Sequence, residues 1–178
     1  MNAKIVFQRY DRIGDVRTTL LDVYADVRAP LLHLPNYAVD AFAERLDRHA
    51  GEAGWEAVLG YDAGEPIGYA YGNTILDGDR WWQRVFPPPS KGYTERPALA
   101  LKEIGVRVPW RGTGAALRLH DTLLFGRTET HVTLMVNPEA GGGKVHRLYE
   151  RWGYRSIGNS QPSPQSPALT VMVRKRQQ

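Results

Sequence analysis

Residues 102–124 read KEIGVRVPWRGTGAALRLHDTLL, and this stretch decides the fold. Its first part continues an alternation of apolar and polar residues that predicts a strand over 98–108. Pro109 breaks the alternation, and beyond RGTGAA the apolar residues recur at helical spacing. The apolar face of this helix comprises Ala116, Leu119 and Leu123. The stretch therefore predicts a strand, a glycine-containing turn and a helix in direct succession.

The segment after this helix completes a crossover. A short apolar run, HVTLMV at 131–136, has the length and composition of a strand. A strand, a helix and a second strand in this order predict two parallel strands joined by a right-handed connection. Further on, Val145, Leu148 and Trp152 form a helical stripe that Gly153 is suited to end. We expect closing strands over 154–157 and 169–174, joined by a loop over 160–167.

The residues upstream of the stretch predict a scaffold. Alternation over 4–10 indicates a first strand, and two strand-like runs, 55–61 and 67–75, flank the turn residues 62–66 and indicate a hairpin. Helices are predicted from Asp11 to Pro30 and over 39–50. Their inward faces are formed by Ile13, Val16, Leu20, Tyr24 and Val27, and by Val39, Phe42 and Leu46.

Residues 77–97 follow neither periodicity and contain three consecutive prolines and two adjacent tryptophans. We expect a long loop here. Long loops in compact domains are often functional, so the loop could be a lid facing a substrate. Trp81 and Trp82 could equally pack on the body of the protein.

Composition limits the class of protein. The chain has 178 residues, no cysteine and 42% hydrophobic residues, which indicates one globular domain spanning 1–178, without disulfides, thiolate metal sites or a cysteine nucleophile. No apolar run is long enough for a membrane span. The first residues reach charge before an apolar segment can form, so we expect no signal peptide and a cytoplasmic protein. The five histidines show no metal-ligand spacing, and we expect no metal.

Charge is distributed unevenly along the chain. Residues 1–89 hold 9 Lys/Arg and 13 Asp/Glu, whereas residues 90–178 hold 14 and 6. A basic half attracts polyanions, either a nucleic acid or a phosphorylated cofactor. The only basic cluster, Arg174 to Arg176, is interpreted as part of a solvated tail over 174–178. No motif of interleaved aromatic and basic residues supports binding of nucleic acid.

The turn at 111–116 has the composition of an anion site. It joins a strand to a helix, where backbone amides are unpaired and the helix dipole favours negative charge. Small residues let a pyrophosphate approach these amides, and Arg111 adds a cation. Glycines also serve ordinary turns and close helix packing, so the turn taken alone favours a structural role.

Two stretches together resemble the GNAT superfamily of N-acetyltransferases. Residues 102–124 are similar to its acetyl-CoA motif, and residues 132–158 are similar to the segment that carries its tyrosine helix, L-Y-E-x-x-G-F/Y. The first similarity rests on Val106, Val108, Arg111, Gly114 and Ala116; the second rests on Leu148, Tyr149, Glu150, Gly153 and Tyr154. The resemblance implies an α/β fold with a mixed, mostly antiparallel sheet, one central parallel pair splayed around the cofactor, and about four flanking helices.

The resemblance implies direct transfer of an acetyl group from acetyl-CoA to an amine in a ternary complex. The amine is expected on a small molecule, with no nucleic-acid or membrane partner and with a homodimer as a possible assembly. A non-catalytic CoA-binding regulatory module of the same fold and a nucleic-acid-binding protein are the alternatives. The expected cofactor-binding residues are Val106, Arg107, Val108, Arg111, Gly112, Thr113, Gly114, Ala115, Ala116 and Asn137.

Two catalytic residues are candidates. The resemblance places the acid at Tyr149, which stays protonated at neutral pH and can protonate the departing thiolate; a core tyrosine is the alternative. Glu103 is the candidate base, since it lies on the strand leading to Val106, on the face opposite Ile104. A surface glutamate paired with Lys102 or Arg107 is an equal alternative.

Overall fold

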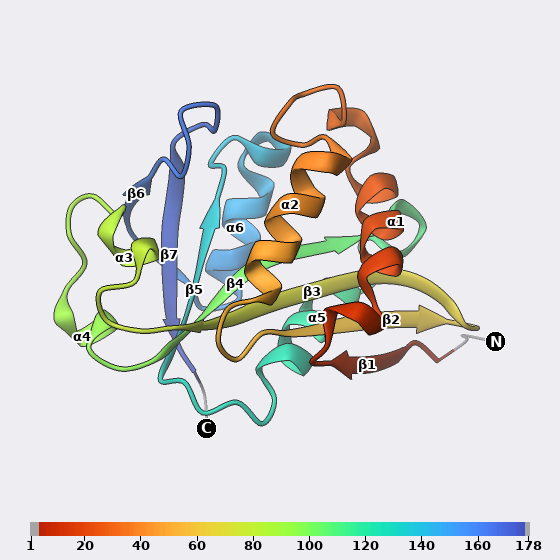
Figure 1. The fold of residues 1–178 in the computed structure, drawn as a ribbon, viewed down its shortest axis with the longest axis horizontal. Helices are drawn as coiled ribbons and strands as arrows, with labels where there is room; N and C mark the ends of the chain where they lie inside the picture. The colour runs from red at the N-terminus through yellow and green to blue at the C-terminus, as the bar shows by residue number, and fades with distance from the viewer. Residues whose placement is uncertain (1–3, 177–178) are drawn as a thin grey trace. The chain divides into compact units, whose positions relative to one another are not determined.

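A computed structural model describes residues 4–176 of the chain (Figure 1). Its strands form a seven-stranded sheet in the order β1-β2-β3-β4-β5-β7-β6. The β4–β5 pair is parallel, and the pairs β1–β2, β2–β3, β5–β7 and β6–β7 are antiparallel. The strands are β1 (Val6–Tyr10), β2 (Glu56–Asp62), β3 (Glu65–Ile75), β4 (Ala98–Val106), β5 (His131–Val136), β6 (Arg155–Ser160) and β7 (Leu169–Lys175). The mixed sheet with one parallel pair is confirmed.

The helices of the described residues are of two kinds. Four have eight residues or more: α1 (Arg17–Val27), α2 (Val39–Ala50), α5 (Ala115–Leu124) and α6 (Lys144–Arg151). Two are single turns, α3 (Arg80–Gln83) and α4 (Lys91–Thr94), and both lie within the predicted loop 77–97. The side chains of Asp79 and Ser90 cap these turns, which is why a segment without helical periodicity still forms them.

The chain divides into two compact units, and strands β3 and β4 each continue from one unit into the other. Unit 1 comprises residues up to 73 together with 102–127, and unit 2 comprises 74–101 together with the residues from 128 onward. In unit 1, α1 and α2 lie on one face of the strands and α5 lies against β2 and β1 (Figure 1). The β2–β3 turn is formed by Ala63 and Gly64, both with positive φ, as a tight hairpin requires.

Unit 2 settles the position of the two tryptophans. Trp82 is 4% exposed and belongs to a buried cluster with Ile75, Val85 and Val171, and Trp81 packs against it. Trp81 Nε1 also donates to Thr133 Oγ1 at 3.3 Å. The tryptophans therefore pack on the body of this unit, which was the second of the two alternatives.

Several predicted boundaries are wrong. Strand β4 ends at Val106 and a 3-10 turn occupies Val108–Trp110, because Pro109 has no amide with which to continue a ladder. A 3-10 turn over Ile13–Asp15 precedes α1, so Asp11 caps no helix. The predicted apolar stripe of α6, Val145, Leu148 and Trp152, is also wrong as its buried face. The buried residue of this helix is Tyr149.

The predicted tail 174–178 is also wrong over its described part. Arg174 and Lys175 belong to β7, where they pair with Val132 and His131. The amide of Arg176 donates to Thr130 O at 2.9 Å. Residues 177–178 lie outside the described part of the chain.

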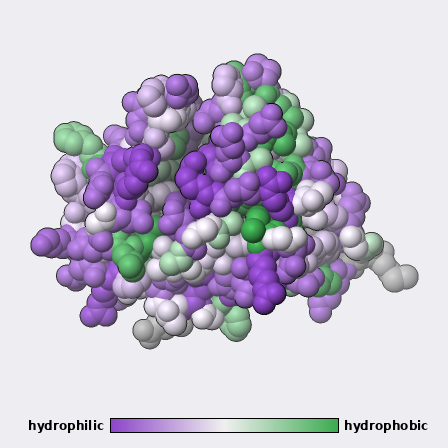
Figure 2. All heavy atoms as spheres, in the orientation of Figure 1, coloured by the Kyte–Doolittle hydropathy of each residue, from purple (hydrophilic) through white to green (hydrophobic). Residues whose placement is uncertain are grey.

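The surface seen in Figure 2 is hydrophilic over most of its area. No helix among the described residues is long and apolar enough to cross a membrane. The core of unit 1 is formed by the apolar faces of α1, α2, β2 and β3. It includes Leu20, Val23, Tyr24, Phe42, Leu46, Leu59, Tyr69 and Tyr71.

The Tyr24–Phe42 stack tests this core. Their ring centroids are 3.7 Å apart, and Phe42 is fully buried. Phe42→Ala removes the stack and leaves a cavity, so the free energy of unfolding should fall by about 3–5 kcal/mol in denaturant titration. Glu44→Ala, an exposed change on the same helix, should alter it by less than about 0.5 kcal/mol. Equal effects of the two substitutions would contradict this assignment of the core.

Candidate functional site

The end of β4 leaves one strand edge without partners. The Arg107 amide donates to Ile67 O of β3 at 2.8 Å. Amides alternate between the two edges of a strand, so the Val106 amide faces the edge away from β3. On that edge the parallel register runs only from Ala98↔His131 to Leu101↔Leu134. The end of β4 therefore offers a backbone donor beyond the last parallel pair.

The loop after β4 positions a second set of donors. Gly112 and Gly114 have φ of +74° and +84°, and Gly114 is the N-cap of α5. No side chain caps this helix, and the first bond into it joins the Arg118 amide to Gly114 O. The amides of the first turn therefore lack partners inside the helix. A Cβ built at either glycine meets nothing within 4 Å, so the space above the loop is open.

The arginines near the loop hold the strand end. Arg111 donates from Nε to Val106 O at 2.9 Å and from Nη2 to Val27 O at 3.4 Å, which ties β4 to α1. Arg107 is paired with Asp26 at 3.3 Å and Glu65 at 3.5 Å. The guanidinium groups of Arg107 and Arg111 therefore lie beside the loop and are already bound to other parts of the protein.

Glu103 lies on the face of β4 that is covered by α1. Its carboxylate is 3.7 Å from the Arg28 guanidinium, and its side chain is 15% exposed. Burial raises the pKa of Glu103, and the positive charges of Arg28 and Arg45 oppose the shift. The alternative of a surface glutamate paired with Lys102 or Arg107 is wrong, because the side chain is mostly buried and forms its ion pair with Arg28.

Aromatic side chains surround this carboxylate. Burial raises the pKa of Tyr24, Tyr69 and Tyr71, and the negative charge of Glu103 contributes to each shift. The Tyr71 hydroxyl lies 2.9 Å from His49 Nδ1. Burial lowers the pKa of His49 to about 3, with help from Lys102, so this imidazole is neutral at pH 7. Sequence reasoning missed this cluster, because its members come from α1, α2 and β3.

Tyr149 and Asn137 lie in unit 2. Tyr149 is 8% exposed, and its ring contacts Trp152 and Tyr154 edge-on, with centroids 5.4 and 5.9 Å apart. Asn137 Oδ1 accepts from the Glu139 amide at 3.0 Å, which begins the turn after β5. Three consecutive glycines with positive φ, 141–143, then lead into α6. From the sequence, these glycines could be interpreted only as a flexible connection between β5 and α6, and their positive φ values could not be predicted.

The structure groups most of the expected site in unit 1. Within this unit, the end of β4, the turn after it and the start of α5 carry Glu103, Val106, Arg107, Val108 and residues 111–116. The described residues contain no group of three or more His, Cys, Asp or Glu side chains placed to hold a metal ion.

Comparison with known proteins supports the fold. No protein-family model and no curated protein matches the sequence. The structure is similar to a GNAT-family acetyltransferase from Streptococcus agalactiae, with a TM-score of 0.71, 12% identity and coverage of 97% and 96% of the two chains. It is also similar to Arabidopsis thaliana NAA60 in complex with acetyl-CoA, with a TM-score of 0.66, 16% identity and coverage of 97% and 98%.

A third similar structure is PH1933 from Pyrococcus horikoshii, with a TM-score of 0.69, 18% identity and coverage of 98% and 100%. At these identities the likeness concerns the fold. The chain has the fold of the GNAT acetyltransferases, and the resemblance carried by residues 102–124 and 132–158 is confirmed at this level.

The Glu103–Arg28 pair gives a test of the site's electrostatics. Arg28→Gln removes a positive charge that opposes the effect of burial, so the pKa of Glu103 should rise further. Carbon-13 NMR titration of labelled glutamate side chains measures it. Arg48→Gln removes an exposed cation of α2 and should leave the Glu103 titration in place. An unchanged or lower value in the first variant would contradict the pairing.

Proposed function

We propose that this protein is an N-acetyltransferase that transfers the acetyl group of acetyl-CoA directly to the amine of a small molecule, in a ternary complex. The open glycine loop at the N-terminus of α5, directly after the free edge of β4, carries the proposal. The fold similarity to GNAT acetyltransferases, one of them solved with acetyl-CoA, supports it.

The residues present fit acetyl-CoA. The open space above Gly112 and Gly114 leaves room for a pyrophosphate, and the first-turn amides of α5 supply neutral donors for it. The end of β4 at Val106 and the residues after it, to Val108, are the proposed partners of the pantetheine amides. When bound, acetyl-CoA supplies an activated acetyl group. The Val106 amide is proposed to polarise the acetyl carbonyl.

Glu103 is the proposed base. An alkyl amine has a pKa of about 10 and must lose a proton before it attacks. A carboxylate with a raised pKa is a stronger base than an exposed one, and burial provides this shift at Glu103. Arg28 keeps the carboxylate charged and oriented.

Tyr149 is the proposed acid. The hydroxyl of a tyrosine keeps its proton at neutral pH and can donate it to the thiolate that leaves as the amide forms. The packing of its ring against Trp152 and Tyr154 restricts its orientation. A core tyrosine would share this packing, so activity separates the two roles.

The acceptor is proposed to be a small amine that reaches the carboxylate of Glu103, whose side chain is 15% exposed. A negatively charged carboxylate favours a cationic acceptor. We propose that the protein acts in the cytoplasm and assembles as a homodimer. The acidic N-terminal half of the sequence agrees with a cationic acceptor.

Calorimetric titration with acetyl-CoA tests the cofactor site. Gly114→Glu places bulk and negative charge at the phosphate loop and should abolish binding that the wild type shows. Gly64→Glu is the matched control, since Gly64 has the same φ of +84° and equally open surroundings in the β2–β3 turn. Absence of binding by the folded wild type, or equal loss in both variants, would overturn the cofactor assignment.

Tyr149→Phe tests the acid. The variant should lower kcat by about 10²–10⁴ while acetyl-CoA affinity stays nearly unchanged, because only the proton donor is lost. CoA release with an accepted amine measures the rate. Tyr154→Phe removes a hydroxyl from the same aromatic cluster and should retain most activity. A wild-type rate in Tyr149→Phe would remove this residue from the mechanism, and cofactor binding without transfer to any amine would favour a CoA-binding module.

A further inference from the structure

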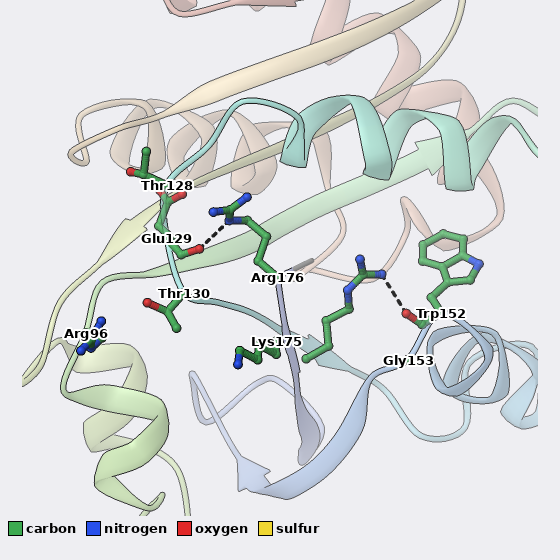
Figure 3. Close-up of a pocket in the computed structure, with 9 residues that line it drawn as sticks. Arg96, Thr128, Glu129, Thr130, Trp152, Gly153, Lys175 and Arg176 are labelled. Atoms are coloured by element: carbon green, nitrogen blue, oxygen red, sulfur yellow. Dashed lines mark hydrogen bonds between the residues drawn. The ribbon is translucent and has the colours of Figure 1, made fainter. Parts of the chain in front are cut away.

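Unit 2 contains a cavity of about 890 Å³ that the proposed reaction does not use. Its walls come from the segment before β5, the end of α6, the end of β7 and the residue Arg96 after α4 (Figure 3). A volume of this size lies within the range of small-molecule sites, about 300–1,000 Å³. The lining residues are Arg96, Thr128, Glu129, Thr130, Trp152, Gly153, Arg174, Lys175 and Arg176.

The cavity is lined mainly by cations and hydrogen-bond donors. Four cationic residues, Arg96, Arg174, Lys175 and Arg176, face one carboxylate, that of Glu129. Glu129 is only 6% exposed, and its Oε1 accepts from Thr74 Oγ1 at 2.9 Å. The two threonines, at 128 and 130, add hydroxyl groups. The wall therefore has an excess of positive charge and few acceptors.

Two of the guanidinium groups are held in place by the backbone. Arg174 Nη1 donates to Trp152 O at 2.8 Å, and Arg176 Nε donates to Glu129 O at 2.6 Å (Figure 3). Arg174 also lies over the Tyr154 ring, with its guanidinium carbon 5.6 Å from the centroid. Groups held in this way lose less side-chain entropy when they bind a ligand.

The other two cations are available. Arg96 and Lys175 are exposed, and within residues 4–176 their side chains make no hydrogen bond or ion pair. Cations that line one hollow in excess of its carboxylates repel one another, so a bound anion relieves this repulsion. Guanidinium groups in particular bind phosphate through two parallel hydrogen bonds.

The positive field extends beyond the cavity. Unit 2 holds 11 Lys/Arg and 6 Asp/Glu, a net charge of +5. A neighbouring hollow of about 350 Å³ shares Gly153, Arg174 and Lys175 with the cavity and adds Arg155 and His131. Burial lowers the pKa of His131, and the charges of Lys175 and Arg155 lower it further. The surroundings thus reinforce the charge of the cavity walls.

The cavity is distinct from the end of β5 that carries Asn137. Thr130 precedes the first residue of β5, and Asn137 follows the last. Seven residue steps at about 3.3 Å each separate the two positions by about 23 Å. A ligand in the cavity would therefore leave Asn137 free.

We propose that this cavity binds a small ligand that carries two or more phosphate groups. Four cationic residues around one half-open hollow match a compact, multiply charged anion better than an extended backbone. This proposal does not depend on the acetyltransferase activity.

Calorimetric titration with sodium tripolyphosphate tests it. The glycine loop of α5 is a second potential phosphate site, so the titration uses the Gly114→Glu protein as background. Binding at one site should persist there and weaken at least about tenfold when Arg96→Gln and Lys175→Gln are added. The matched control adds Arg48→Gln and Arg80→Gln, two exposed cations that do not line the cavity, and should keep the affinity.

Amide NMR of the wild-type protein keeps the test independent of how well the variants fold. Tripolyphosphate should shift the amides of Thr130 and Gly153. Shifts confined to residues 112–116, or binding that is absent or insensitive to the Arg96 and Lys175 substitutions, would overturn the proposal. Citrate binding of equal affinity would overturn the choice of phosphate. Tighter binding of a single-stranded oligonucleotide, with affinity that falls steeply with salt, would assign the surface to nucleic acid instead.

Discussion

The backbone pairing of β4 is the constraint on which the proposed site depends. Its first four residues pair with β5, and its last residues lie beside β3, where Arg107 still donates to Ile67. Gly68 and Gly105 allow this approach, because a Cβ on Gly68 would lie 2.7 Å from Gly105 O. Buried backbone donors need partners, so an edge that leaves its ladder is stable only where water or a ligand replaces the lost strand. The same pairing that holds the sheet together thus exposes the donor at Val106.

A second consequence of β4 is the environment of Glu103. Alternation along the strand points this carboxylate toward α1 and away from α5, so it is surrounded by the core of unit 1. Burial alone would favour the neutral acid, and Arg28, 3.7 Å away, favours the charged form. The balance leaves a carboxylate with a raised pKa that is still paired, which suits repeated gain and loss of a proton. An exposed glutamate would be a weaker base, and an unpaired buried one would resist ionisation.

The sequence predicted those parts of the structure that depend on local order along the chain. The helix over 39–50 and the strand over 131–136 have the predicted bounds, and the glycine turn lies between β4 and α5 as expected. Contacts between distant segments could not be predicted this way. The Arg28–Glu103 pair joins residues 75 positions apart, and no spacing rule brings them together. The interpretation of 174–176 as a tail failed for the same reason, because the strand that pairs with these residues begins more than 40 positions upstream.

The two proposed anion sites, one in each unit, use different physical means. The loop at the start of α5 offers neutral backbone amides, in a unit whose charged residues nearly cancel, with 12 Lys/Arg and 13 Asp/Glu. Such a site selects a phosphate by close approach and geometry. The cavity of unit 2 offers full charges on side chains, within a unit of net charge +5. Exposed charges are screened by salt within about 10 Å, whereas aligned amides act at contact distance. The uneven distribution of charge along the sequence therefore corresponds to two kinds of recognition. The proposed site in unit 1 recognises an anion by shape, and the proposed site in unit 2 attracts it by charge.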